Sequence, residues 1–451
     1  MLFGGKVTQA MLWTRERLTG WGKSSHSTSL VADPVTADEL VAALQESKDL
    51  TLLARGAGRS YGDAALNADG RVLRTAAMTA IHAFEPATGE ITVEPGVSFG
   101  QLVREFANRS WIPPVTPGTQ FATVGGAIAN DVHGKNHDAD GSFGDHLRWF
   151  DLAMADGSVQ RVDAESLPEL FAATLGGIGL TGVITRACFR MKRVPGPLLL
   201  VRERRLRDLE EYLDALAESR GRHQYSVGWI DGVATGRRLG RGILETADHI
   251  EEQWDRAARR TIRVPFNLPS GTINSKTIGL FNRLYYMRVP KRGRERKIDL
   301  ERFFYPLDAI TDWNRIYGRS GFVQFQCVIP DVEARRAIRR LLEHITASGR
   351  GSFLAVIKTL GRTGQGLLSF PMPGVTLALD FPRTQGIAEF LTSLHEVTLE
   401  HGGRIYLAKD SCVTARQFQR MYPRFGVLQA ILRRIDPTRR MRSDMSTRLQ
   451  L

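Results

Sequence analysis

A series of glycine-rich segments in the first 190 or so residues is the feature that most constrains what this chain can fold into. The segments are 55–63 (RGAGRSYGD), 117–119 (PGT), 123–134 (TVGGAIANDVHG), 141–145 (GSFGD) and 175–182 (LGGIGLTG). Glycine lets the main chain approach a ligand closely, and successive backbone amides beside it can form a concave nest for an anion. A turn needs one such segment, whereas a large pyrophosphate-bearing cofactor needs several, so the series predicts a cofactor site.

One of these segments contains a literal GxGxxG, at 177–182. In a Rossmann fold this fingerprint follows a strand and opens a helix. Here the order is reversed, because 166–169 (SLPE) cap a helix before the glycines and 183–189 (VITRACF) alternate like a strand after them. The sequence therefore predicts a tight helix-to-strand turn, close to a ligand, and not a Rossmann site.

Local patterns around the glycine segments indicate a mixture of short helices and strands. The sequences 36–39 (TADE) and 98–101 (SFGQ) are capping boxes and predict helices to about residues 46 and 108. Apolar or alternating runs predict strands at 50–54, 91–93 and 321–329, and a further helix is expected at 207–219. The fold class expected from these elements is α+β.

Residues 111–147 differ from their surroundings, because they are dense in Gly, Pro, Thr, Asn, Asp and His and show little periodicity. The plain interpretation of such a stretch is a surface loop. Val124, Ala127, Ile128 and Ala129 are nevertheless apolar enough to be buried. Long irregular segments inside compact regions are often functional, so this one is predicted to belong to the site.

Composition excludes several classes of protein. Of 451 residues, 42% are hydrophobic and 24% charged, which is ordinary globular usage. The net charge is 61 − 48 = +13, yet the basic residues are spread out and no nucleic-acid-binding module is evident. No run approaches the ~18 apolar residues of a membrane span, and the N-terminus lacks the ~7-residue apolar core of a signal peptide. We expect a soluble cytoplasmic protein, with peripheral contact at the inner membrane left open.

Metal and disulfide chemistry are not expected. Cys188, Cys327 and Cys412 are far apart and form no CxxC. Asp131, His133, His137 and His146 could be taken for a metal cluster, but Gly134 and Asn136 interrupt the helix that would align His133 with His137. A histidine hydrogen-bonded to the backbone or to a ligand is the preferred interpretation.

In this order, RGAGRSYGD, PGT, TVGGAIANDVHGKNH, GSFGD and LGGIGLTG resemble the FAD-binding domain of the vanillyl-alcohol-oxidase and aldonolactone-oxidase superfamily, over about residues 40–190. The resemblance implies a two-subdomain (PCMH-type) FAD-binding domain with the pyrophosphate on the glycine nests. The cofactor-binding residues that it implies are Arg55, Gly56, Ala57, Gly58, Arg59, Ser60, Tyr61, Pro117, Gly118, Thr119, Thr123, Gly125, Gly126, Ala129, Asn130, His133, Asn136, Gly179, Gly182, Ile184, Tyr406 and Lys409.

The motifs HGKNH, VGWID, FYPLD, WNRIYG, FVQFQCVIP, LSFPMPG, LDFP and YLAKDS extend the resemblance almost to the C-terminus. They are similar to the family of decaprenylphosphoryl-ribose 2'-oxidases, the flavin subunits of a two-enzyme epimerase that makes the arabinofuranose donor of mycobacterial cell walls. The resemblance implies a FAD-binding domain at 1–193, an α+β substrate-binding domain with an antiparallel sheet at 194–403, and a C-terminal segment, 404–451, that returns to the FAD domain. The substrate-binding residues implied are Lys135, Trp229, Tyr317, Gln324, Gln326, Lys358 and Ala378.

Two positions depart from the relatives. Many members of the superfamily attach FAD covalently through a histidine where this chain has Arg59, so we expect non-covalent FAD. Ala378 stands where the mycobacterial relatives carry a cysteine beside the flavin, and Thr376 replaces an asparagine in the same strand. Hydride transfer does not require that cysteine, but covalent trapping by nitroaromatic inhibitors does.

The resemblance implies that the 2'-hydroxyl of a polyprenyl-phosphoryl-β-D-ribofuranose is oxidised to a ketone by hydride transfer to the flavin. Lys409 is the first candidate for the general base, and Tyr61 and His133 are further catalytic candidates. The interpretation of Lys409 as a surface lysine paired with Asp410 would otherwise be preferred.

A separate NAD(P)H-dependent reductase would then complete the epimerisation. The basic, aromatic-bearing stretch 280–302 is either a contact with anionic membrane or a solvated loop. The alternative function is a soluble FAD-dependent sugar-alcohol or aldonolactone oxidase that uses O₂.

Overall fold

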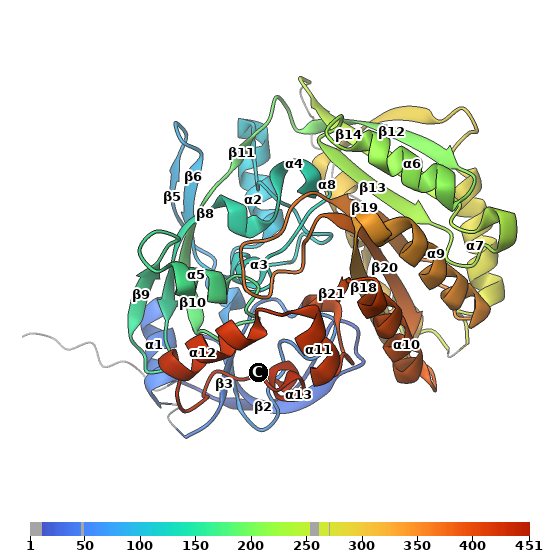
Figure 1. Cartoon of the computed structure of the whole chain (residues 1–451). Coiled ribbons are helices and arrows are strands. Elements are labelled where there is room, and N and C mark those ends of the chain that lie inside the picture. Colours follow the sequence, from blue (N-terminus) through green and yellow to red (C-terminus); the bar gives the residue numbers. More distant parts are fainter. Residues whose placement is uncertain (1–10, 47–48, 253–260, 270) are drawn as a thin grey trace, which may run out of the picture.

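The computed structural model describes residues 11–46, 49–252, 261–269 and 271–451. Three sheets dominate it, and the fold is α+β, as the sequence predicts (Figure 1). The first ten residues, part of the N-terminal stretch assessed for a signal peptide, lie outside the described residues.

A four-stranded sheet with the order β1-β2-β4-β3 forms the first unit. Its elements are β1 (Thr14–Thr19), β2 (His26–Ala32), α1 (Ala37–Glu46), β3 (Leu52–Arg55) and β4 (Arg71–Arg74). The expected capping residues start α1, since the amide of Glu39 donates to Thr36 Oγ1 at 3.2 Å and the amide of Val35 donates to the Glu39 carboxylate at 2.9 Å. β3 then delivers the first glycine segment at the carboxyl end of a parallel strand pair.

A five-stranded antiparallel sheet with the order β5-β6-β10-β8-β9 forms the second unit. Its elements are β5 (Ile81–Glu85), β6 (Glu90–Val93), α2 (Phe99–Phe106), β7 (Trp111–Ile112), β8 (Leu147–Ala153), β9 (Val159–Val162), α5 (Pro168–Thr174), β10 (Val183–Arg190) and β11 (Lys192–Arg193). Phe99, Phe143 and Phe189 are fully buried and in ring contact, so the sheet and the segment at 111–147 share one core.

The segment 111–147 is less irregular than its composition suggests. The segment contains α3 (Val124–Ala129), α4 (His137–Asp140) and a 3₁₀ turn at Phe143–His146. Each is only one or two turns long, so it produces no hydrophobic periodicity that a sequence pattern could reveal. Tertiary hydrogen bonds fix the start of α3, because the amide of Val124 donates to Val97 O and the amide of Gly125 to Pro95 O, both at 2.9 Å.

An eight-stranded sheet with the order β16-β12-β14-β13-β19-β20-β18-β21 forms the third unit. Its strands are β12 (Leu198–Leu206), β13 (Tyr225–Ile230), β14 (Gly242–Ile250), β16 (Arg294–Asp299), β18 (Phe322–Pro330), β19 (Ala355–Leu360), β20 (Gly374–Pro382) and β21 (Arg404–Ile405), and a separate parallel pair joins β15 (Ile262–Arg263) to β17 (Ile310–Thr311). Its helices are α6 (Leu209–Ser219), α7 (Ser275–Met287), α8 (Leu300–Phe304), α9 (Asp331–Ala347) and α10 (Ile387–Glu400). Figure 1 shows α6, α9 and α10 lying along one face of this sheet.

Alternation along the central strands divides the large sheet into two faces. Phe325, Leu377 and Ile357 are fully or almost fully buried in the core that α6, α9 and α10 share. Their sequence neighbours Gln326 and Ala378 point the other way, since successive strand residues face opposite sides. The face away from the helices therefore carries the polar side chains that the sequence singles out.

The C-terminal segment runs from the large sheet back to the first one. After β21 it forms α11 (Ala415–Met421), α12 (Phe425–Ile435) and α13 (Asp444–Leu449). The amide of Leu52 in β3 donates to Arg440 O at 2.7 Å, and the amide of Arg442 donates to Leu52 O at 2.8 Å. Residues 440–442 thus hydrogen-bond to β3, the strand that carries the first glycine segment. The domain limits at 193/194 and 403/404 stay a prediction from the sequence.

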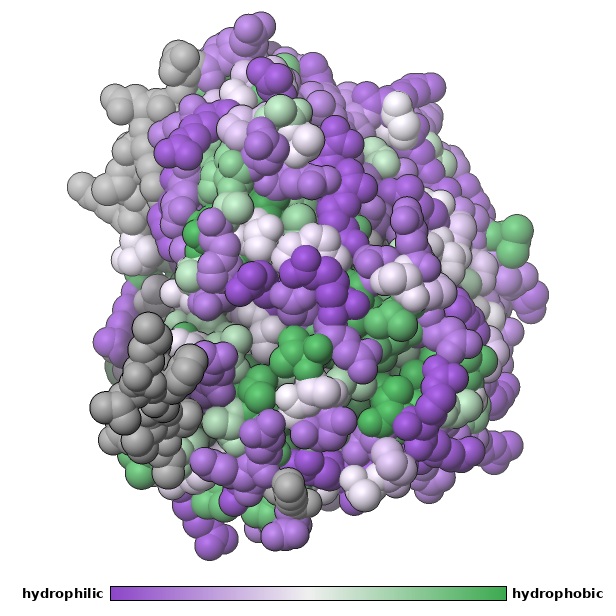
Figure 2. Space-filling view, turned by 90° about the vertical axis from the view of Figure 1, so that its left-hand side faces the viewer, coloured by the Kyte–Doolittle hydropathy of each residue, from purple (hydrophilic) through white to green (hydrophobic). Residues whose placement is uncertain are grey.

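In the described part of the chain, no helix has both the length and the apolar character needed to cross a bilayer. The face seen in Figure 2 is mostly hydrophilic, with hydrophobic residues gathered only in small groups.

Candidate active site

A cavity of about 950 Å³ is lined by residues from all three sheets. It brings together most of the residues predicted for the site. Those that line it are Gly56, Ala57, Gly58, Arg59, Ser60, Tyr61, Pro117, Gly118, Thr119, Thr123, Gly125, Gly126, Ala129, Asn130, His133, Lys135, Gly179, Gly182, Ile184, Trp229, Gln324, Gln326, Lys358, Ala378, Tyr406 and Lys409.

Three predicted residues lie outside the lining. Arg55 donates to Ala65 O at 2.7 Å and to Thr19 O at 2.8 Å, so it shapes the first glycine segment from behind. Asn136 donates to Pro114 O at 2.7 Å and is buried. Tyr317 stacks on Phe322, with ring centroids 4.3 Å apart. Arg55 thus binds a lining residue, Ala65, whereas Asn136 and Tyr317 make these contacts outside the lining.

The glycine segments bring main chain up to the cavity wall. A Cβ added at Gly118 would meet no protein atom within 4 Å, so this backbone borders open space. At Gly125 an added Cβ would lie 2.8 Å from Pro95, and at Gly56 it would lie 2.4 Å from Thr123 Oγ1. Side chains at these two positions would push the segments apart. The wall therefore fits an elongated ligand that needs close contact with backbone amides.

The GxGxxG segment forms the predicted helix-to-strand turn between α5 and β10. Gly179 and Gly182 have φ values of +78° and +149°, which side-chain-bearing residues rarely adopt. The amide of Ile178 donates to Ala129 O at 2.8 Å, so the turn is tied to the end of α3. Both glycines line the cavity, so the turn borders the candidate site, and it leads from a helix to a strand, the reverse of a Rossmann unit.

Arg59 holds an unusual position at the wall. Its guanidinium carbon lies 4.3 Å from the ring centroid of Trp21 and 4.6 Å from that of Phe121. Arg59 Nε is buried and has no hydrogen-bonding partner among the described residues. A cation held between two rings, with an unused donor, suits a phosphate or another anion of a ligand.

The polar part of the cavity rests on the face of the large sheet that points away from α6, α9 and α10. Across β18, β20 and β19, Gln326 is paired with Ala378 and Ala378 with Val356, while Thr376 is paired with Lys358. Gln326 Nε2 lies 3.3 Å from Thr376 Oγ1 and 3.2 Å from His133 Nε2. Strand register thus gathers amides, a hydroxyl and an ammonium group over a small area.

Lys135 and Lys358 bring two ammonium groups to the cavity. Lys358 Nζ donates to Gly134 O at 3.0 Å, and Lys135 Nζ donates to Phe303 O. Enclosure within the protein lowers the pKa of Lys358 to about 7, with Lys135 and Lys409 adding repulsion, and lowers the pKa of Lys135 to about 8. An anionic ligand group would relieve this repulsion, so the pair favours a phosphate.

Lys409 lies at the junction of the two walls. Its Nζ is 3.7 Å from the ring centroid of Tyr61. Burial lowers its pKa, and the nearby Asp380 carboxylate opposes that change. Asp410, the neighbour expected from the sequence, is instead bound by Arg448 Nη2 at 2.9 Å. The acidic neighbour of Lys409 is therefore Asp380.

Sequence reasoning missed Asp380. It is 1% exposed at the end of β20, behind the lining, and its carboxylate accepts from Gln324 Nε2. Burial raises its pKa. The available signal was one acid in an otherwise apolar strand, VTLALDFP. Asp308, in the FYPLD motif, was missed too: it accepts from Thr119 Oγ1 at 3.0 Å and from the Gln120 amide at 2.7 Å, tying the third unit to the second glycine segment.

His133 is buried and uncharged near neutral pH. Burial lowers its pKa well below the ordinary range, and Lys358, His137 and Lys409 lower it further. Its Nδ1 has no hydrogen-bonding partner among the described residues. Tyr61 is the opposite case, because burial raises its pKa well above 10 and holds it protonated. Of the two, His133 is better suited to accept a proton.

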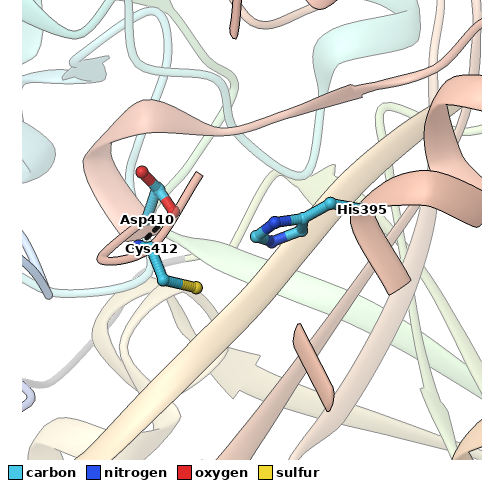
Figure 3. Close-up of side chains that lie close together, drawn as sticks. All are labelled: His395, Asp410 and Cys412. Atoms are coloured by element: carbon cyan, nitrogen blue, oxygen red, sulfur yellow. Dashed lines mark hydrogen bonds between the residues drawn. The ribbon is translucent and has the colours of Figure 1, made fainter. Parts of the chain in front are cut away.

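The histidines suspected of metal binding are not assembled into a metal site. The ring centroids of His133 and His137 are 6.3 Å apart, and His146 Nε2 lies 2.8 Å from Asp140 O. Among the described residues, a metal-like trio is instead formed by His395, Asp410 and Cys412, in which His395 points from α10 toward the other two (Figure 3).

The carboxylate of that trio is already bound without an ion. Asp410 Oδ1 accepts from the amides of Cys412 and Val413, each at 2.9 Å, and its Oδ2 accepts from Arg448. Burial raises the pKa of the Cys412 thiol, which disfavours the thiolate that a metal needs. A guanidinium beside the carboxylate would also repel a cation.

Comparisons with known proteins agree with this geometry. Residues 28–163 match the family model described as an FAD binding domain. The chain is 37% identical to a decaprenylphosphoryl-β-D-ribose oxidase of Mycolicibacterium smegmatis, over 97% of this chain and 98% of that protein. It is 32% identical to an uncharacterized protein of Streptomyces coelicolor, over 76% of this chain and 96% of that protein.

The fold is also found in a solved structure of low sequence identity. A xylooligosaccharide oxidase from Myceliophthora thermophila, solved with xylobiose, superposes with a TM-score of 0.69 over 94% of this chain and 92% of its own, at 16% identity. Together with the glycine-lined wall, these likenesses assign the cofactor. The chain belongs to the decaprenylphosphoryl-β-D-ribose oxidase family and is an FAD-dependent oxidoreductase.

Proposed function

We propose that this enzyme oxidises the 2'-hydroxyl of a polyprenyl-phosphoryl-β-D-ribofuranose to the 2'-keto sugar, the first half of epimerisation to the arabinofuranose donor. The observation that carries the proposal is the composition of the cavity. One wall is glycine backbone that suits FAD, and the opposite wall offers amides and enclosed ammonium groups that suit a sugar phosphate. The full-length likeness to the mycobacterial oxidase supports the same substrate.

FAD would lie along the glycine segments 55–63, 117–119 and 123–134 and along the 177–182 turn. Arg59 would lie beside an anionic part of the cofactor. When bound, it supplies a hydride acceptor, which no side chain can provide. Arg59 stands where a covalent histidine link would otherwise form, so the protein would hold the cofactor by contacts alone. The unpartnered Arg59 Nε and His133 Nδ1 are donors and acceptors that such a ligand could satisfy.

The opposite wall would hold the substrate. Gln324 and Gln326 present amides that can bind ribose hydroxyls, and Lys135 and Lys358 would pair with the phosphodiester. Since enclosure lowers both lysine pKa values, the arriving phosphate would raise them again and favour the charged forms. The sugar would therefore be oriented by hydrogen bonds and anchored by charge.

Lys409 remains the first candidate for the base. Its lowered pKa gives a neutral fraction near physiological pH, and neutral Nζ can accept the 2'-hydroxyl proton. Asp380 would then stabilise the resulting ammonium group. His133, neutral near physiological pH, is the second candidate, while Tyr61 would position Lys409 through its ring.

The test is anaerobic mixing of the flavin-loaded enzyme with farnesylphosphoryl-β-D-ribose, followed by loss of the oxidised-flavin absorbance. We expect rapid bleaching and formation of the 2'-keto product by mass spectrometry. Bleaching by aldonolactones or free pentoses, but not by this substrate, would contradict the proposal and favour the sugar or lactone oxidase.

The product also requires a partner. A ketone becomes the arabino epimer only if hydride returns to the other face, so a separate NAD(P)H-dependent reductase would act next. Adding such a reductase and NADPH should convert the keto product to the arabino sugar without release of phosphate.

We further infer that the stretch 280–302 contacts an anionic membrane surface. Arg283, Lys291 and Arg292 are exposed there, beside the exposed Leu280 and Leu284 of α7. Arg288 and Arg294 are paired with the buried Glu203, which offsets part of their charge. Co-sedimentation with liposomes should rise with the fraction of anionic lipid; binding that ignores this fraction would favour a solvated loop.

A further inference from the structure

The cavity continues from its polar part into an apolar end beside α7. Along one row of the large sheet, Gln326 is followed by Ala378, Val356 and Trp229 on successive strands, and all four line the cavity. The polar side chains of this row therefore end at Gln326, and the three residues that follow it are apolar. Trp229 Nε1 donates to Phe353 O at 3.0 Å, so its polar group is satisfied and its ring presents only apolar surface.

Aromatic rings carry this apolar surface to the outside. The ring centroids of Trp229 and Tyr285 are 4.8 Å apart, those of Tyr285 and Phe281 are 5.7 Å apart, and those of Phe281 and Phe353 are 5.8 Å apart. Phe281 lines the cavity and is also 45% exposed, so the series reaches the surface at this residue. Glu245, on the strand next to Trp229, also lines the cavity. Its charge is compensated, because its carboxylate forms an ion pair with Arg288 at 2.9 Å.

The outer face of α7 continues the same surface. Leu280, Leu284 and Met287 are 62%, 58% and 47% exposed, and with Phe281 they follow helical spacing along one side of the helix. Figure 1 places α7 on the part of the large sheet remote from the first sheet. An apolar lining that leads to exposed apolar side chains suits a flexible hydrocarbon chain that enters the site from outside.

We propose that the apolar end formed by Ala378, Val356, Trp229, Tyr285, Phe281 and Phe353 is a subsite for the first isoprene units of the substrate's lipid chain. The inference rests on the proposed function and adds to it where the chain runs. The phosphate, held by Lys358 and Lys135, would mark the boundary between the two parts of the cavity. Burial of the first units would be used to hold the sugar in place, as remote binding energy commonly is.

The experiment compares two substrates that differ only in the chain, farnesylphosphoryl-β-D-ribose and methylphosphoryl-β-D-ribose. With the wild-type holoenzyme we expect kcat/KM to be at least tenfold higher for the farnesyl compound. Phe281→Asp should remove most of that advantage and leave kcat/KM for the methyl compound within twofold. The matched control is Phe266→Asp, since Phe266 is 63% exposed and lies outside the cavity lining.

A second measurement does not depend on any variant being folded. Farnesyl phosphate should inhibit the wild-type holoenzyme at concentrations at least tenfold below those of inorganic phosphate. Equal kcat/KM for the two substrates, or equal inhibition by the two phosphates, would overturn the subsite while leaving the proposed function intact. Failure of both substrates to reduce the flavin would overturn the proposed function and the subsite with it.

Discussion

At the scale of single residues, Lys409 is the proposed general base. The ammonium group lies over the Tyr61 ring, with the Asp380 carboxylate as its acidic neighbour. A general base of this kind accelerates proton transfer by about 10²–10⁴-fold.

We expect Lys409→Ala to lower the rate of flavin reduction by a factor in the range of about 10²–10⁴, with FAD still bound. The measurement is stopped-flow reduction by substrate, with the flavin content from the absorbance spectrum as control. Wild-type reduction rates in this variant would remove Lys409 from catalysis and move the role to His133.

Asp380 is expected to influence the pH at which Lys409 becomes neutral and can accept a proton. Its carboxylate favours the charged form of Lys409, so Asp380→Asn should lower the pKa of Lys409 further. The base would then be neutral at lower pH, and the acidic limb of the kcat/KM profile should move down by about one unit. An unmoved limb would show that Lys409 does not titrate in this profile.

Lys358 is predicted to lower the free energy of unfolding, although it is expected to bind the substrate. Its pKa is lowered from 10.5 to about 7, so the unfolded chain holds the proton more tightly between these values, and stability must rise with pH across that window. Lys358→Met should therefore stabilise the protein by about 2 kcal/mol at pH 7, allowing for water in the cavity, and by much less near pH 10.

Thermal unfolding of the two proteins at several pH values measures this difference, and KM for substrate should rise in the variant. Exposed Lys297 supplies the control, Lys297→Met, which should change neither. A stabilisation that stays constant with pH would show that packing, and not charge, is responsible.

At the scale of elements, α13 acts as a latch on the first glycine segment. Arg448 donates to both oxygens of Asp63 at 2.8 Å and to Asp410 at 2.9 Å, so one guanidinium joins the end of that segment to the loop after Lys409. The contact raises the pKa of Arg448 and lowers that of Asp410.

Arg448→Met should cost about 3–5 kcal/mol, because it leaves two enclosed carboxylates facing each other, and should speed FAD release. Chemical denaturation and flavin fluorescence measure the two effects. Arg434→Met removes an exposed pair with Glu169 and should cost less than about 1 kcal/mol. Similar losses in the two variants would contradict the latch.

At the scale of the whole molecule, the prediction concerns how FAD is held. With Arg59 in place of a linking histidine, acid precipitation should leave all of the flavin in the supernatant. Flavin retained in the pellet would reveal a covalent link elsewhere and would weaken the likeness to the decaprenylphosphoryl-ribose oxidases. The spectra of pellet and supernatant decide between these outcomes.

The α+β class, the capped starts of α1 and α2 and the helix-to-strand turn at 177–182 could be predicted from sequence, because caps, glycines and alternation act over a few residues. Most of the residues that the motif likeness predicts also line the cavity. The likeness did not separate Arg55, Asn136 and Tyr317, which lie outside the lining, from residues that form it. Whether a side chain faces a cavity or the layer behind it depends on neighbours far away in the chain.

The order and spacing of the glycine segments are local properties, so the sequence alone could predict that glycine backbone would line the candidate site, as it does. Only the tertiary structure decided that the acidic neighbour of Lys409 is Asp380 and not the adjacent Asp410, and that α3 and α4 form within 111–147. The physical reason is the same in each case. Strand register, burial and long-range hydrogen bonds set the surroundings of these residues, and none of the three can be deduced from a single stretch of chain.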